Sequence, residues 1–82
     1  MQISTSSPVI RYLAAGRYKA SVTASYNKKP GQVKLGVRSG SLVTMQVGGK
    51  GPRIDRVFEH FGGTLALLAD PKVECIIEIT EV

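Results

Sequence analysis

Apolar and polar residues alternate without a break from Arg17 to Tyr26, and this alternation constrains the fold more than any other feature of the sequence. Because successive side chains of a β-strand point to opposite faces, a period of two predicts a strand with one buried and one solvated face. Arg17 and Lys19 lie on the solvated face. The buried face takes the apolar residues, which are Tyr18, Ala20, Val22, Ala24 and Tyr26.

Two further alternating segments follow, over residues 32–38 and 41–47. Asn27 to Gly31 and Ser39-Gly40, which precede them, have the composition of turns, because proline fixes φ and glycine accepts a positive φ. Three successive strands with short turns predict an antiparallel meander. Such a meander would gather the cations of its solvated face, namely Arg17, Lys19, Lys34 and Arg38.

One short helix is predicted behind the third strand, at about residues 52–61. The apolar residues Ile54, Val57, Phe58 and Phe61 have the i, i+3, i+4, i+7 spacing of one helix face. Proline at position 52 suits the first helical position, and the glycines at 62 and 63 would end the helix.

The remaining segments are predicted to be strands. Residues 64–69 form a short apolar run, Asp70-Pro71 is a turn, and residues 72–82 alternate again. The opening segment, 2–12, fits an edge strand or one helical turn, and the strand is preferred. Residues 1–82 are therefore predicted to form a single β-rich domain. Its class is mainly β, as a small antiparallel β-sandwich or partly open barrel of about five or six strands with the one short helix.

Positive and negative charges are separated along the sequence, within a net charge of +5. No acidic residue precedes Asp55, whereas Arg56 and Lys72 are the only basic residues that follow it. A positive surface attracts phosphates or an acidic protein surface. The alternative is that the two halves neutralise each other across neighbouring strands.

Residue types that build catalytic and metal sites are scarce. Cys75 and His60 are the only cysteine and histidine, which excludes a disulfide within the chain and leaves too few ligands for a zinc site. We expect Cys75 to be a buried thiol and His60 to be a solvent-facing or capping residue at the helix end. Glu74 and Glu78 are expected on an exposed strand face, which does not suit acid–base catalysis. The sequence predicts no enzyme, no cofactor, no metal and no small-molecule substrate.

The glycine-rich segment 48–51 is the one motif that suggests a ligand. Glycines ahead of a helix let backbone N–H groups converge on an anion, and the helix N-terminus adds partial positive charge. Lys50 is followed by glycine and proline, so the spacing of a nucleotide-binding Walker loop is absent. Neutralisation by the chain's own Asp55 and Glu59 is the favoured interpretation, with a protein carboxylate or a phosphate as the alternatives.

Two functions from different classes fit these observations. The first is a non-enzymatic structural or adaptor module that self-associates or docks on a larger protein assembly, for example as a virion subunit or capsid decoration. Its acidic contact surface would comprise Glu74, Glu78 and Glu81. The second is a small basic nucleic-acid-binding domain that contacts phosphates through the 17–38 hairpin and the 48–53 loop. The basic residues assigned to binding, of protein or of phosphate, are Arg17, Lys19, Lys28, Lys29, Lys34, Arg38, Lys50 and Arg53.

Two details qualify these hypotheses. The alternation places Tyr18 and Tyr26 on the face opposite Arg17 and Lys19, so stacking of bases on tyrosine is not expected.

No apolar stretch approaches the roughly 18 residues of a membrane span, and residues 1–7 do not resemble a signal peptide. We therefore expect no membrane partner and a protein made in the cytoplasm, with incorporation into a virion under the first hypothesis.

Overall fold

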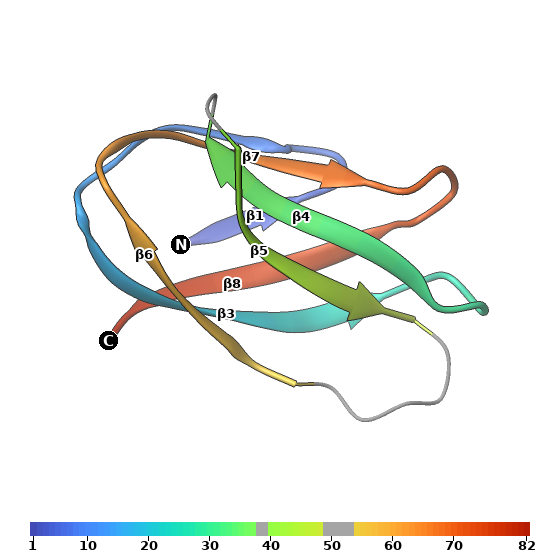
Figure 1. Ribbon diagram of the computed structural model, residues 1–82. Coiled ribbons are helices and arrows are strands. Elements are labelled where there is room, and N and C mark those ends of the chain that lie inside the picture. Colours follow the sequence, from blue (N-terminus) through green and yellow to red (C-terminus); the bar gives the residue numbers. More distant parts are fainter. Residues whose placement is uncertain (38–39, 49–53) are drawn as a thin grey trace.

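The computed structural model describes residues 1–37, 40–48 and 54–82, which form two antiparallel sheets packed face to face (Figure 1). The first sheet has the strand order β1 (Gln2–Ser4), β8 (Cys75–Glu81), β3 (Gly16–Ser25), β6 (Arg56–His60). The second sheet has the order β2 (Val9–Leu13), β7 (Gly63–Ala69), β4 (Gly31–Val37), β5 (Gly40–Val47). The predicted mainly-β class is confirmed, and the described residues contain eight strands, more than the five or six predicted.

The strands pair as nested hairpins. β4 pairs with β5, β3 with β6, β2 with β7 and β1 with β8, and the pairs β3–β8 and β4–β7 complete the two sheets. Eight strands in this order constitute a double-sheet jelly roll. The sandwich among the predicted architectures is therefore the one that the chain adopts.

The core lies between the sheets and consists of the inward-facing side chains of both. Alternation predicts most of it correctly: Val33 and Leu35 of β4 are fully buried, as are Cys75 and Ile77 of β8. The predicted strands over 64–69 and 72–82 are confirmed as β7 and β8. The preferred interpretation of the opening segment is confirmed as well, because β1 and β2 are both edge strands.

The meander predicted for residues 17–47 is wrong, although its three strands are present as β3, β4 and β5. Only β4 and β5 form a hairpin, whereas β3 lies in the other sheet between β8 and β6 (Figure 1). The connection over residues 26–30 therefore crosses between the sheets instead of turning back within one. Alternation determines which side of a strand is buried and leaves its pairing partner open.

The helix predicted at about residues 52–61 is wrong over its described part, and residues 52–53 lie outside the described residues. In β6 the buried residues are Phe58 and His60, while Val57 and Glu59 are exposed, which is a period of two. Pairing with β3 and the strand preference of valine and phenylalanine outweigh the helical spacing. Within the described residues no helix is long and apolar enough to cross a bilayer.

Candidate functional site

The cations of β3 are neutralised by carboxylates of the neighbouring chain segment. Arg17 Nη2 donates a hydrogen bond to Glu59 Oε1 at 3.1 Å, and the β3–β6 register places these residues directly opposite each other. Lys19 Nζ lies 3.9 Å from Asp55 Oδ2. Neutralisation between the two halves of the chain, the alternative that the sequence left open, is thus observed at both positions, with Asp55 directly preceding β6. Because all four side chains are about half exposed or more, these pairs contribute little to stability.

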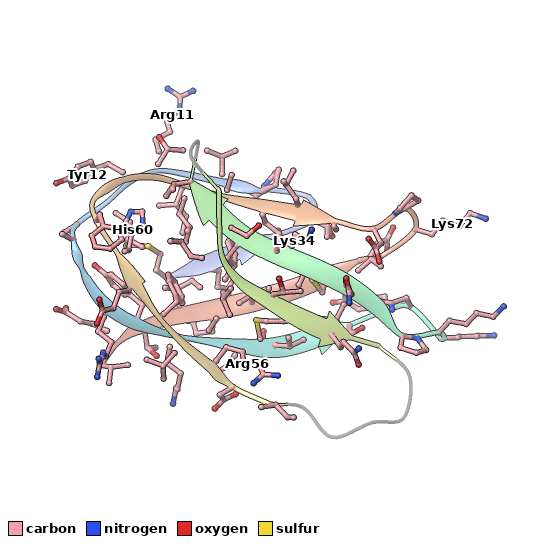
Figure 2. All side chains as sticks on the ribbon, in the orientation of Figure 1. Arg11, Tyr12, Lys34, Arg56, His60 and Lys72 are labelled. Carbon is pink, nitrogen blue, oxygen red and sulfur yellow. The ribbon has the colours of Figure 1, made fainter. Side chains whose placement is uncertain are left out.

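The single basic face predicted from the meander does not form. Lys34 lies between the buried residues Val33 and Leu35, so its side chain points outward from the second sheet (Figure 2). Arg17 and Lys19 belong to β3 of the first sheet, on the other side of the sandwich. Arg38, Lys50 and Arg53, which the sequence also assigns to binding, lie outside the described residues.

The three residues of the predicted acidic surface follow the length of β8. Glu74 precedes the strand and Glu81 ends it, which separates them by roughly 20 Å. Glu78 accepts a hydrogen bond from the Met1 amino group at 2.9 Å, and this bond lowers the pKa of the Glu78 carboxyl. The three carboxylates are therefore spread along one strand and do not converge on a common point.

The outer face of the second sheet carries almost no charge. In its four described strands there is no aspartate or glutamate, and the only charged residues are Arg11 and Lys34. Leu68 and Ala66 point outward because they alternate with the buried Leu65 and Leu67, and Val9 is paired with Ala66. The exposed fraction is 50% for Val9 and 69% for Leu68. Sequence reasoning missed this face, because residues 64–69 form a continuous apolar run without the alternation that marks an exposed side.

Small residues deepen the middle of this outer face. Gly36 lies opposite Ala66 in the β4–β7 register, and neither side chain rises from the sheet surface. The resulting shallow hollow is lined by Gly36, Val37, Gly62, Thr64 and Ala66.

The connection between β3 and β4 and the turn between β7 and β8 meet at one end of the sandwich (Figure 1). They line a common hollow whose basic residues are Lys28, Lys29 and Lys72. Figure 2 shows Lys72 extending from this end of the molecule. None of the three lysines forms an ion pair with a carboxylate of the described residues. Lys28 and Lys29 were among the predicted binding residues, whereas Lys72 was not.

Tyr26 is exposed, although the alternation predicts it to be in the core. The pairing of β3 with β8 is shifted between Val22 and Ala24 by a β-bulge. One extra residue reverses the faces beyond it, so that Ser25 is paired with the buried Cys75 and Tyr26 points to solvent with 67% of its surface exposed. The Tyr26 N–H donates to the Glu74 carbonyl oxygen at 3.0 Å, which fixes this residue beside the β7–β8 turn.

His60 is buried, whereas the sequence predicted a solvent-facing or capping residue. Only 2% of its surface is exposed, because it occupies an inward position of a strand and not the end of a helix. Its Nε2 lies 3.0 Å from the Gly63 carbonyl oxygen, and its ring meets Tyr18 edge-on. Among the described residues its Nδ1 has no hydrogen-bond partner.

Cys75 is buried as predicted, and this burial raises the pKa of its thiol. Within the described residues, no group of three or more histidine, cysteine, aspartate or glutamate residues is placed to hold a metal ion. The described chain therefore offers two candidate surfaces, the outer face of the second sheet and the lysine-lined end. No protein-family model, no curated protein and no solved structure matches this chain.

Proposed function

We propose that this protein is a non-enzymatic structural module that self-associates, or docks on a larger protein assembly, through the outer face of its second sheet. The observation that carries the proposal is the scarcity of charge on this face, whose strands hold only Arg11 and Lys34, together with the exposure of Val9 and Leu68. The cores of protein–protein interfaces are depleted of charged residues, and contiguous exposed apolar surface marks an interaction site.

Energetic considerations favour the same surface. Complete burial of a valine or leucine side chain contributes about 1.5–3 kcal/mol. A lone core in a domain of 82 residues supplies only about 3–5 kcal/mol, so that association adds a substantial fraction of the total stability. The outer face of the first sheet is less suitable, because it carries the exposed ion pairs of Arg17 and Lys19.

The strand order supports a structural role in a particle such as a virion. Double-sheet jelly rolls occur in viral capsid and lectin domains and in cupins. Because one fold hosts many functions, the fold alone assigns none of them. The proposal therefore rests on the nearly uncharged outer face of the second sheet, and the jelly-roll strand order is consistent with a module that assembles into a particle.

Light scattering coupled to size-exclusion chromatography tests self-association. We expect the wild-type chain to have an oligomeric mass that decreases on dilution. Leu68→Glu replaces an exposed apolar side chain of the proposed interface by a carboxylate and should yield a monomer. The fold should tolerate this change, because the residue is exposed and lies opposite Lys34, which can pair with the new carboxylate.

Val57→Glu is the matched control. Val57 is 54% exposed and points outward from the first sheet, where the same substitution should leave the oligomeric mass unchanged. A wild-type chain that is monomeric at every concentration would contradict self-association. Equal masses for Leu68→Glu and the wild type would exclude this face as the interface.

A further inference from the structure

We propose that the lysine-lined end of the sandwich binds single-stranded nucleic acid, independently of the self-association proposed above. This lysine end comprises Lys28 and Lys29 of the β3–β4 connection, Lys72 of the β7–β8 turn, and the exposed Tyr26. The lysines would contact phosphates, and the tyrosine ring would stack on a base.

Hydrogen bonds between Gln32 and Asp70 join two chain segments that are far apart in the sequence at this end of the sandwich. The Gln32 N–H donates to Asp70 Oδ2 at 2.9 Å, and the Asp70 N–H donates to the Gln32 carbonyl oxygen at 3.0 Å. One carboxylate oxygen of Asp70 is thus engaged by the backbone, and no ion pair with a neighbouring lysine is formed. The hydrogen bonds hold the lysines of both segments around one hollow.

The lysine at position 72 adopts a backbone conformation that carries an energetic cost. The Val73 N–H donates to the Asp70 carbonyl oxygen at 3.2 Å, which closes a four-residue turn with Pro71 as its second residue. Lys72, the third residue, has a φ of 68°, a conformation that favours glycine. A residue held in a sparsely populated conformation points to a role for its side chain, here a positive charge at the rim of the hollow.

Tyr26 determines which polyanion fits best. Single-stranded nucleic acids are bound where basic groups follow the phosphates and an aromatic ring stacks on a base, and both kinds of group are exposed at this end. An acidic peptide would use the lysines but has no base to stack on the ring. Glu74, whose carbonyl oxygen accepts the Tyr26 N–H, places a carboxylate at the flank, so we expect Glu74→Gln to strengthen binding.

Fluorescence anisotropy with a labelled oligothymidine strand tests the lysines. The wild type should bind at low salt, with an affinity that falls linearly on a log–log salt plot. The triple variant Lys28→Ala, Lys29→Ala, Lys72→Gly should bind more weakly, and the magnitude of its salt slope should decrease by about 2, because each phosphate contact to a single strand contributes roughly 0.7. The matched control removes the same charge from the first sheet, through Arg17→Ala, Lys19→Ala and Arg56→Ala, and should retain the wild-type slope.

Substitution of Tyr26 separates stacking from charge attraction. Tyr26→Ala should weaken binding roughly tenfold without a change in the salt slope, whereas Tyr26→Phe should bind as the wild type does. Thermal unfolding of each variant establishes that the comparison is made between folded proteins.

Several results would overturn the proposal. They are the lack of any binding at low salt, equal weakening by the two triple variants, and a Tyr26→Ala variant that binds like the wild type. Tighter binding of a labelled polyglutamate peptide would assign the lysine end to an acidic protein instead. The oligomeric mass of the first triple variant should equal that of the wild type, because none of its substitutions lies on the outer face of the second sheet, so the two proposals fail separately.

Discussion

Lys72 and Tyr26 are two residues whose conformation or exposure differs from what the sequence pattern predicts. Lysine occupies a position with a φ of 68°, which glycine would adopt without strain, and tyrosine is exposed just beyond a bulge that reverses the faces of β3. Neither feature could be predicted from the sequence. A turn type depends on backbone angles that Pro71 only partly restricts, and the bulge arises from pairing with β8, a strand about fifty residues away.

The backbone of Lys72 leads to a prediction about stability. Lys72→Gly should raise the free energy of unfolding by up to about 1 kcal/mol. Glycine removes the steric strain of the left-handed conformation in the folded state, and this gain exceeds the loss caused by the greater conformational entropy of the unfolded chain. Urea denaturation measures the difference. Lys29→Gly, in the neighbouring connection at a position without a positive φ, should give no gain. A Lys72→Gly variant less stable than Lys29→Gly would contradict the assigned strain.

Cys75 leads to a prediction about reactivity. Its burial raises the pKa of the thiol, so the thiolate that attacks disulfide reagents is depleted at neutral pH and is also inaccessible. An aromatic disulfide reagent should react with the native protein far more slowly than with the protein in denaturant, where the thiol is exposed. Equal rates in the two conditions would show that Cys75 is exposed in the folded chain.

Single strands are the level at which the sequence was most informative. Alternation correctly identified β3, β4, β5 and β8, because burial of one side of a strand leaves a local period of two. The buried face of β3 was predicted correctly only as far as its bulge. It did not identify which strands are neighbours, since pairing depends on contacts between distant segments. The short strand β6 was mistaken for a helix because its apolar residues fit both periods over so few positions.

The strand assignment of β6 can be tested with two neighbouring residues. Phe58→Ala should remove about 3–5 kcal/mol, most of the stability of a domain of this size, because Phe58 is 5% exposed and packs on Tyr18. Val57→Ala should change the free energy of unfolding by less than about 1 kcal/mol, since Val57 points to solvent. Similar large losses in urea denaturation for both variants would favour the helix, in which both residues belong to the buried face.

The described part of the molecule has two chemically different outer faces and a basic end. The first sheet presents charges of both signs, the second presents Val9, Ala66 and Leu68 with almost no charge, and the lysines converge where two connections meet. The sequence predicted the separation of charge and the mainly-β class. It could not predict these surfaces, because they follow from a strand order that places β3 and β4 in different sheets.

The measurement that tests this account most directly is the change in backbone amide NMR signals when the protein is diluted. We predict that the signals of Val9, Ala66 and Leu68 shift as the oligomer dissociates. The signals of Lys19 and Glu59, on the first sheet, should remain unchanged. Dilution shifts confined to the first sheet, or spectra that do not change with concentration, would contradict the assignment of the outer face of the second sheet as the assembly surface.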